Sequence, residues 1–172
     1  MKILAISGSL RKASLNSMLL RAVARVAPSD MDVILYRGLG ELPLFNPDIE
    51  DPVPAPVALL REQIVMADAV LLASPEYAHG VSGVMKNALD WMVGNESFVY
   101  KPVALLNTSP RASHAIAALR ETVITMSARV IDAACITLPL LGSGLVEEEI
   151  VHDPKLSRVL TEMLQSLRQA VS

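Results

Sequence analysis

Five short apolar runs alternate with five longer segments of helical character, and this alternation limits the folds open to the chain. The runs cover residues 2–7, 31–36, 69–73, 103–107 and 133–138. Between and after them, apolar side chains recur every three or four residues, as in helices with one buried face. Strands that alternate with helices form a parallel sheet covered on both faces, and five of them favour the order 2-1-3-4-5. We therefore expect an α/β three-layer sandwich with a five-stranded parallel sheet of order 2-1-3-4-5.

The composition agrees with one domain built around a buried sheet. Hydrophobic residues make up 52% of the 172 residues and charged residues 19%, against roughly 45–50% and 25% in ordinary domains. A sheet covered on both faces needs this excess, which also leaves apolar surface for self-association. No repeat, low-complexity tract or linker divides the chain, so we expect residues 1–172 to form a single domain.

Several classes of protein are disfavoured by what the sequence lacks. No stretch approaches the roughly 20 apolar residues that cross a bilayer, and the first residues do not have the pattern of a signal peptide. The single cysteine, Cys135, rules out an internal disulfide and is typical of a reducing compartment. A net charge of −3 without a basic cluster argues against nucleic acid and membrane partners. We expect a soluble cytoplasmic protein.

The turn after the first apolar run has the composition of an anion site. Its polar residues end at Asn16, just after which a helical pattern starts. The N–H groups at the start of a helix have no intrahelical acceptor and carry partial positive charge. Ser9, Ser14 and Asn16 add neutral donors, and Arg11 adds a planar charged fork. The turn is interpreted as a cradle for a cofactor phosphate, or alternatively as a simple helix cap.

The expected sheet order decides between these two interpretations. Ligands of such sheets bind beyond the carboxyl ends of the strands, where the order reverses. The turns that would meet there cover residues 7–16, 74–80 and 108–111, which are also the turns with the most unusual chemistry. This coincidence favours the cradle. The glycine-rich patterns of dinucleotide and nucleoside triphosphate sites are absent, so the cradle is lined by serine and arginine.

The second of these turns suits a flat, heterocyclic ligand. It lies between apolar segments, Tyr77 offers aromatic area with a polar tip, and Gly80 allows a close approach. For His79 the alternative is a surface-turn histidine without a task. For Glu76 the alternative is a carboxylate that caps a helix or forms an ion pair.

The third turn and the remaining reactive side chains give weaker signals. Ser109 and Arg111 could complete the site, although Arg111 alone also suits a solvated turn. The histidines lack the spacing of metal ligands, so no metal site is expected. Cys135 lies in an apolar run, where a buried and inert thiol is expected.

Residues 37–56 form a long irregular segment rich in proline and glycine. It contains Leu42, Leu44 and Phe45, which are too apolar for a disordered loop, so we expect it to fold back over the body or over a partner subunit. The helical segment after residue 82 carries Trp91, which we expect in the core or at a subunit interface. We expect Met85 and Met92 on the same helix to pack at an interface.

Three motifs in order make the chain resemble the NADPH-dependent FMN reductase family, a flavodoxin-like family that includes quinone, chromate and azo-dye reductases. They are Gly8-Ser9-Leu10-Arg11 with Ser14 and Asn16, then Pro75-Glu76-Tyr77, then Lys86-Asn87-Ala88-Leu89-Asp90-Trp91. The resemblance extends over nearly the whole chain. It implies a flavodoxin-like fold, bound FMN, and reduction by NADPH or NADH.

The resemblance also implies the roles of individual residues. The residues implied for the FMN phosphate are Ser9, Arg11, Ser14, Asn16 and Ser17. Those implied for the border of the isoalloxazine ring are Pro75, Glu76, Tyr77 and His79, with Ser109 approaching from the third turn. Members of the family are commonly dimers or tetramers, which implies a homodimer or homotetramer here.

Two positions depart from the usual pattern of the family. Ala78 stands where asparagine often follows Pro-Glu-Tyr, which removes a side-chain amide near the flavin. Ser82 stands where proline often precedes the glycine, and we expect it to loosen the start of the following helix. Neither position belongs to the phosphate turn.

The sequence therefore predicts an FMN-dependent NAD(P)H oxidoreductase. Hydride passes from nicotinamide to flavin and on to a small acceptor such as a quinone, an azo dye, free flavin or a metal oxyanion. Such chemistry needs stacked rings and no side-chain acid or base. Two alternatives stay open, a flavodoxin-type electron carrier and a flavin-binding protein without useful catalysis.

Overall fold

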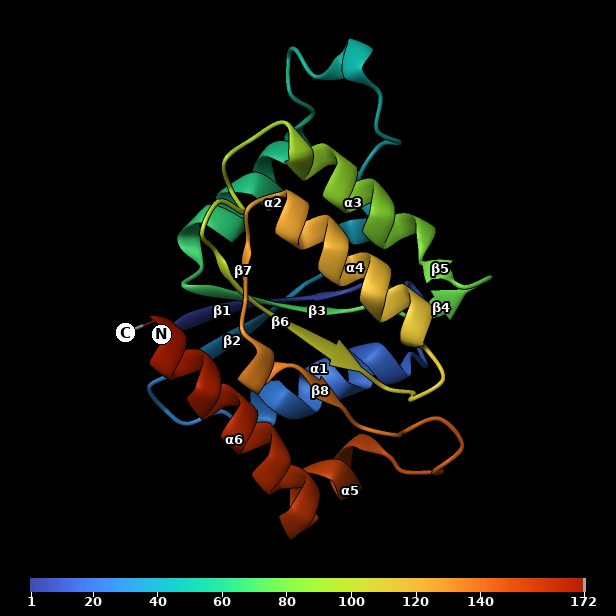
Figure 1. Ribbon diagram of the computed structural model, residues 1–172, viewed down its shortest axis with the longest axis vertical. Coiled ribbons are helices and arrows are strands. Elements are labelled where there is room, and N and C mark those ends of the chain that lie inside the picture. Colours follow the sequence, from blue (N-terminus) through green and yellow to red (C-terminus); the bar gives the residue numbers. More distant parts are fainter. Residues whose placement is uncertain (172) are drawn as a thin grey trace.

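The central sheet runs in the order β2-β1-β3-β6-β7 and is parallel throughout. The computed structural model describes residues 1–171 (Figure 1). The strands are β1 (Lys2–Ser7), β2 (Asp32–Tyr36), β3 (Ala69–Ala73), β6 (Pro102–Asn107) and β7 (Arg129–Val130), and β8 (Ile136–Thr137) pairs with β6 further along. Because β1 pairs with both β2 and β3, the order reverses beside β1, as expected for a flavodoxin-like fold.

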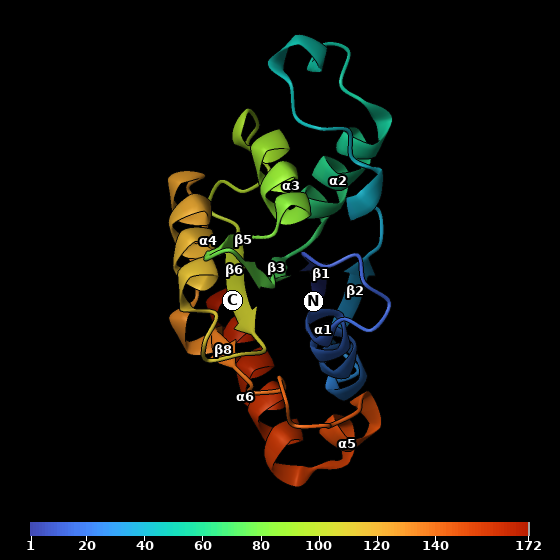
Figure 2. The ribbon, with the colours of Figure 1, turned by 90° about the vertical axis from the view of Figure 1, so that its right-hand side faces the viewer.

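Alternate side chains of the buried strands serve two separate cores. Leu4 and Ile6 of β1 face the layer of α2 (Ala55–Met66), α3 (Gly83–Val93) and α4 (Ser113–Thr125). Ile3 and Ala5 face the layer of α1 (Leu15–Val26) and α6 (Pro154–Val171). Figure 2 shows these two layers on opposite sides of the sheet. The expected three-layer sandwich is therefore confirmed.

The fifth strand position differs from the prediction. The sequence predicts one strand over residues 133–138, whereas the structure has β7 and β8 separated by a 3₁₀ turn, η3 (Asp132–Ala134). The backbone N–H of Leu105 in β6 donates to the Cys135 sulfur at 3.3 Å, so a side chain replaces the ladder acceptor there. Continuous pairing is interrupted because this thiol and the turn occupy the strand edge.

Three further elements were missed or displaced. α1 begins at Leu15, so Asn16 lies inside the helix and not before it. The second turn contains a small antiparallel hairpin of β4 (Glu76–Tyr77) and β5 (Gly80–Val81). A short acidic helix, α5 (Glu147–His152), precedes α6 and packs beside α1, where Arg21 binds its first residue at 2.6 Å.

The long segment after β2 folds back onto α3, as predicted. Its short turn η1 (Leu39–Glu41) buries Leu39, and the carbonyl of Pro43 accepts a hydrogen bond of 2.8 Å from the Trp91 indole. Phe45 packs edge-on against that indole, with ring centroids 5.1 Å apart. The tip, which holds η2 (Pro47–Ile49), projects away from the sheet (Figure 1).

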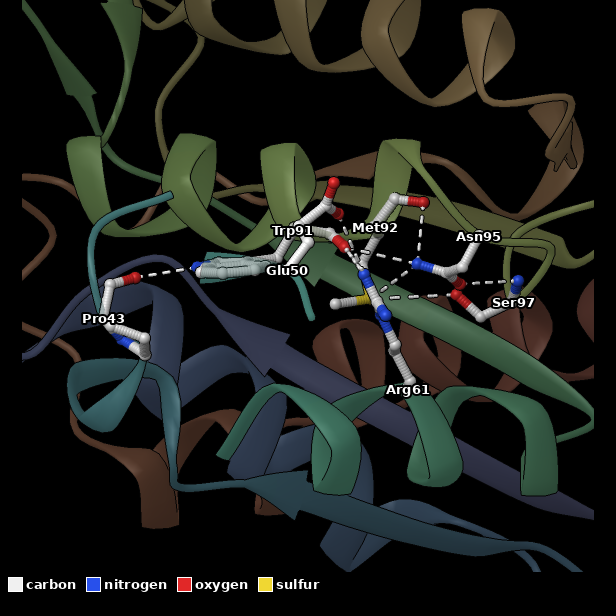
Figure 3. Close-up of polar contacts among 7 residues, drawn as sticks. All are labelled: Pro43, Glu50, Arg61, Trp91, Met92, Asn95 and Ser97. Carbon is white, nitrogen blue, oxygen red and sulfur yellow. Dashed lines mark hydrogen bonds and ion pairs between the residues drawn. The ribbon is translucent and has the colours of Figure 1, made fainter. Parts of the chain in front are cut away.

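A polar network fixes the base of this segment (Figure 3). The Arg61 guanidinium of α2 donates to the carbonyl of Trp91 at 2.8 Å and lies 3.5 Å from the Glu50 carboxylate. Asn95 donates to the carbonyls of Trp91 and Met92 at the end of α3. The network therefore joins the long segment, α2 and α3 around one helix terminus.

The interior side chains of α3 settle one alternative left open by the sequence. Trp91 is fully buried, and Met85 and Met92 are each 1% exposed within the single chain. They belong to the core, not to a subunit interface. No helix within residues 1–171 has both the length and the apolar character that a membrane span requires.

Candidate functional site

The three turns singled out by the sequence meet in one cleft beyond the carboxyl ends of β1, β3 and β6. The cleft has a volume of about 310 Å³, within the range of small-molecule sites. It is lined by Ser9, Arg11, Ala13, Ser14, Leu15, Asn16, Ser74, Pro75, Glu76, Tyr77, Asn107, Thr108, Ser109, Arg111, Ala112 and Leu141. The reversal of strand order beside β1 opens this space because the crossovers leave it in opposite directions.

The first wall is the start of α1. Ser14 is the N-cap residue, and its hydroxyl accepts a hydrogen bond from the backbone N–H of Ser17 at 3.2 Å. The N–H groups of Leu15 and Asn16 belong to the first turn, where the helix supplies no acceptor. The Ser14 side chain therefore caps the helix, while the helix dipole and these two N–H groups face the cleft region.

Asn16 joins the first wall to the third. Asn16 is 5% exposed, and its amide oxygen accepts a hydrogen bond from the Thr108 hydroxyl at 3.4 Å. This contact leaves the two amide N–H donors of Asn16 without an acceptor among residues 1–171. Arg11 lies at the exposed rim, and its guanidinium has no ion pair within the same residues.

The second wall is the β4–β5 hairpin. Glu76 pairs with Val81 and Tyr77 with Gly80, so that Ala78 and His79 form a two-residue turn. Both have positive φ, 49° and 59°, as in a type I′ turn. This turn favours asparagine and glycine, which gives a conformational reason for the asparagine that the family often has where Ala78 stands. Tyr77 is 56% exposed at the mouth of the cleft.

Glu76 has a structural task at the back of this hairpin. Its carboxylate accepts a hydrogen bond of 2.8 Å from the backbone N–H of Ala115 in the first turn of α4. The His79 ring lies 3.7 Å from the same carboxylate and packs edge-on against His114, with centroids 4.3 Å apart. Glu76 therefore caps a helix, which is one of the interpretations that the sequence left open for it. His79 lies outside the lining of the cleft.

The expectation that Ser82 loosens the start of α3 is wrong. Ser82 is 2% exposed and is the N-cap of α3, accepting a hydrogen bond from the N–H of Met85 at 3.4 Å. Its own N–H donates to the Ser74 hydroxyl at 3.2 Å. A Cβ on Gly8 would lie only 2.7 Å from the Ser82 hydroxyl oxygen. The first two turns therefore pack closely enough to need glycine at position 8.

The third wall is held by its own backbone. Ser109 is 8% exposed, its hydroxyl accepts from the N–H of Arg111 at 3.2 Å, and its N–H donates to the side chain of Asn107 at 3.1 Å. The carbonyl of Thr108 accepts from the N–H of Leu140 at 3.0 Å. That bond draws the loop after β8 to the cleft and brings in Leu141.

Comparison with known proteins identifies the family. Residues 1–140, which include all three walls except Leu141, match the model of the NADPH-dependent FMN reductases. The chain belongs to the NADPH-dependent FMN reductase family. The predicted enzyme class and the predicted cofactors, FMN with NADPH or NADH, are confirmed by this membership. It favours the reductase over the electron carrier.

Relatives of this FMN reductase extend over most of its length. It is 30% identical over 169 residues to a quinone reductase of Escherichia coli strain K12, covering 94% of this chain and 86% of the relative. It is 32% identical to an NAD(P)H-dependent FMN reductase of Pseudomonas aeruginosa, covering 97% and 93%. The solved structure of FerB, a flavoenzyme NAD(P)H:acceptor oxidoreductase of Paracoccus denitrificans, is 27% identical with a TM-score of 0.84, covering 99% and 96%.

The structure brings together most of the residues implied for the flavin. Eight of the ten line the cleft, namely Ser9, Arg11, Ser14, Asn16, Pro75, Glu76, Tyr77 and Ser109. Ser17 lies on the opposite face of the first turn, where its hydroxyl is 2.8 Å from that of Ser7. His79 lies outside the lining, with its side chain 76% exposed.

Seven lining residues had no role predicted from the sequence, namely Ala13, Leu15, Ser74, Asn107, Thr108, Ala112 and Leu141. Asn107 and Thr108 end β6 and start its turn, and they could have been found as polar residues that end an apolar run. Leu141 and Ala13 carry no chemical signal. Leu141 reaches the cleft only because its loop binds the backbone of Thr108.

Proposed function

We propose that this chain is an FMN-containing oxidoreductase that uses NADPH or NADH to reduce quinones and similar small-molecule acceptors. The observation that carries the proposal is the donor-rich start of α1 at one side of a cleft whose other walls offer a flat slot. The quinone reductase of Escherichia coli supports the choice of acceptor. We also propose that residues 1–172 act as one FMN-binding domain.

The donors of the first wall suit a phosphate group. The N–H groups of Leu15 and Asn16, the Asn16 amide and the Arg11 guanidinium have no acceptor among residues 1–171 and come from one turn. A phosphate monoester supplies several acceptor oxygens and up to two negative charges, which match both the donors and the helix dipole. Ser9 and Ser14 contribute hydroxyls at the same wall. The backbone N–H of Ser17 donates to the Ser14 hydroxyl, so Ser17 contributes by holding the first turn of α1 in place.

The other walls suit the ring system. Pro75 and Tyr77 provide apolar and aromatic surface, and the backbone of Glu76 lies between them. Ser109 faces the slot from the third turn, and His79 stays at its outer margin through its contact with His114. Bound FMN supplies the hydride chemistry, while these residues hold the ring at a fixed depth and keep water from one side.

Reductant and acceptor are expected to use the cleft in turn. The three turns enclose a slot about 310 Å³ in volume, and a nicotinamide must stack directly on the flavin for transfer. Sequential occupancy predicts ping-pong kinetics, with parallel double-reciprocal lines. Intersecting lines would contradict shared use of the slot.

Self-association and a cytoplasmic location are part of the same proposal. Several large apolar side chains near the cleft and the long segment are exposed, notably Leu10, Leu44, Tyr77 and Leu141. Exposed apolar surface of this kind is typical of subunit interfaces, which supports a homodimer or homotetramer. A single partly buried cysteine agrees with a reducing compartment.

The proposal is tested on purified protein by its visible spectrum and by titration with FMN. We expect a yellow protein that oxidises NADPH and accelerates when a benzoquinone is added. Arg11→Ala should weaken FMN binding about tenfold or more, because it removes a charge-assisted bond. Arg158→Ala, on the exposed face of α6, serves as the control. A colourless protein that takes up no FMN would refute the proposal, and FMN binding without NADPH oxidation would instead indicate a carrier.

A further inference from the structure

One cation of the cleft has no task once a phosphate occupies the first wall. Two arginines line the cleft, Arg11 in the first turn and Arg111 in the third. Arg11 belongs to the donors proposed for the phosphate of FMN, and Arg111 is not one of them. Arg111 is exposed, and its guanidinium has no hydrogen bond or ion pair among residues 1–171. It therefore offers a planar charged fork of donors to a second ligand.

The third turn carries Arg111 from the phosphate wall toward the hairpin. At the start of this turn, the Thr108 hydroxyl contacts Asn16 of the phosphate wall at 3.4 Å. Further along, the backbone N–H of Ala115 donates to the Glu76 carboxylate of the hairpin at 2.8 Å. Arg111 lies between these two contacts in the chain and lines the cleft, so it belongs to the part of the cleft that the hairpin closes. This part is the slot proposed for the ring system.

The backbone around Arg111 is fixed by hydrogen bonds. The Ser109 hydroxyl accepts from the N–H of Arg111 at 3.2 Å, and the Ser109 carbonyl accepts from the N–H of Ala112 at 3.0 Å. Only the side chain of Arg111 is then left to adjust when a ligand enters. A charge that is already held at one edge of the slot costs less ordering entropy on binding than a charge on a mobile loop.

Positive charge dominates this end of the cleft. Glu76 is the only acidic residue among the described residues that line the cleft. Its carboxylate already accepts from the N–H of Ala115 and lies 3.7 Å from the His79 ring. α4 begins at Ser113 without a capping side chain on its N-cap residue, so its dipole adds partial positive charge at the same wall. A negative group that enters the slot therefore meets an unpaired guanidinium and no competing carboxylate.

We propose that Arg111 makes this enzyme select aromatic acceptors that carry a negative charge, such as quinones with a sulfonate or carboxylate substituent, over uncharged quinones of similar size. The inference rests on the proposed function, in which the acceptor stacks in the ring slot. An acceptor that stacks there brings its substituents to the edge of the slot, where a guanidinium binds a sulfonate or carboxylate through two parallel hydrogen bonds. An uncharged quinone gains no such bond, so the discrimination between the two acceptors comes from Arg111.

The test compares two acceptors that share one ring system, 1,4-naphthoquinone-2-sulfonate and 2-methyl-1,4-naphthoquinone. FMN-loaded protein is reduced with an equivalent of dithionite in the absence of oxygen and mixed rapidly with each quinone. The return of the oxidised flavin spectrum then gives a second-order rate constant without NADPH in the solution. Arg111→Gln should lower the ratio of the two rate constants, sulfonate over methyl, about fivefold or more, and Arg111→Lys should keep part of it. Arg158→Gln removes the same charge from the exposed face of α6 and should leave the ratio unchanged.

Binding without turnover gives a second readout. Oxidised, FMN-loaded protein is titrated with 4-hydroxybenzenesulfonate and with phenol, which accept no hydride, and the change in the visible spectrum gives each dissociation constant. The unsubstituted protein should bind the sulfonate about fivefold or more tightly than phenol, and Arg111→Gln should lose this difference. Added salt should reduce the preference of the unsubstituted protein, because Arg111 is exposed, and should have less effect on the variant.

The outcomes separate this inference from the proposed function. An unchanged ratio in Arg111→Gln, or equal binding of the two aromatic ligands by the unsubstituted protein, would overturn the inference. An equal fall of the ratio in Arg158→Gln would also overturn it, because the preference would then come from the net charge of the protein and not from the cleft. The proposed function would stand in each of these cases if the protein takes up FMN and reduces the uncharged quinone. Absence of FMN uptake and of any turnover would refute the proposed function and this inference with it.

Discussion

The Glu76 carboxylate accepts a hydrogen bond of 2.8 Å from the backbone N–H of Ala115, which ties the second turn of the cleft to the start of α4. α4 has no capping side chain of its own, because its N-cap residue is Ala112. A carboxylate from another turn thus satisfies a helix-terminal donor and complements the helix dipole. The position of the hairpin against α4 depends on this contact.

Removing this cap should destabilise the protein. We expect Glu76→Ala to lower the free energy of unfolding by about 1 kcal/mol, in line with the loss of a helix cap, and Glu76→Gln to lose less because it keeps an acceptor. Urea unfolding measures the effect. Glu121→Ala, on the exposed side of the same helix, is the control. A Glu76→Ala protein as stable as the control would contradict the capping role.

The two-residue turn of the hairpin stores conformational strain. Ala78 and His79 both have positive φ, which costs roughly 1 kcal/mol for residues with a Cβ. Ala78→Asn and His79→Gly should therefore each raise the free energy of unfolding by about 0.5–1 kcal/mol. Thermal unfolding checks this, with Ala118→Asn in the middle of α4 as an expected destabilising control. A lower midpoint for Ala78→Asn would show that the turn is not strained.

Cys135 should make stability fall at alkaline pH. Burial raises the pKa of this thiol, with opposition from the N–H of Leu105 and the charge of Arg120. The folded protein then holds the proton at pH values where the unfolded chain, with a pKa of about 8.5, releases it. The contribution is complete below about pH 8.5 and is lost as pH rises through the folded pKa.

Two measurements examine this thiol. The slope of unfolding free energy against pH, between about pH 8 and 9.5, should be less negative in Cys135→Ala than in the unsubstituted protein. Alkylation by iodoacetamide at pH 8 should be slower for the folded protein than for the urea-unfolded chain. Equally fast alkylation of both forms would contradict a raised pKa.

Asn87 should hold the long segment on α3. Its amide nitrogen donates to the carbonyl of Pro43 at 2.9 Å, and its amide oxygen accepts from the N–H of Phe45 at 2.7 Å. Asn87→Ala leaves the N–H of Phe45 without a partner and leaves the Pro43 carbonyl with the Trp91 indole alone, so it should cost about 1–3 kcal/mol. We also expect faster proteolysis within residues 46–54. Lys86→Ala, which removes only an exposed ion pair with Asp90, should change neither quantity by much.

Local patterns were sufficient for the strands and helices that form the two cores. β3 is an uninterrupted apolar run, and α6 repeats apolar residues on one face, so neighbours in sequence already encode burial. The cradle at the start of α1 was also visible, because helix starts and phosphate donors use residues only a few positions apart. These features depend on short-range chemistry.

The features that could not be predicted from the sequence depend on contacts between residues far apart in the chain. The thiol of Cys135 interrupts the fifth strand because it meets the backbone of Leu105, 30 residues away. α5 carries three glutamates in its first turn and is held by arginines of α1, 126 residues away for Arg21 and Glu147. No periodicity within six residues predicts such a helix.

The sequence by itself determined the layered α/β fold, the strand order and the anion-binding character of the first turn, because hydrophobic period and helix-start chemistry are local. Only the tertiary structure decided that Glu76 caps α4, that Ser82 tightens α3, and that Lys12, Tyr36 and Arg37 line the same hollow. These pairings arise where parallel strands bring their carboxyl ends to one edge, and spacing along the chain does not record which side chains meet there.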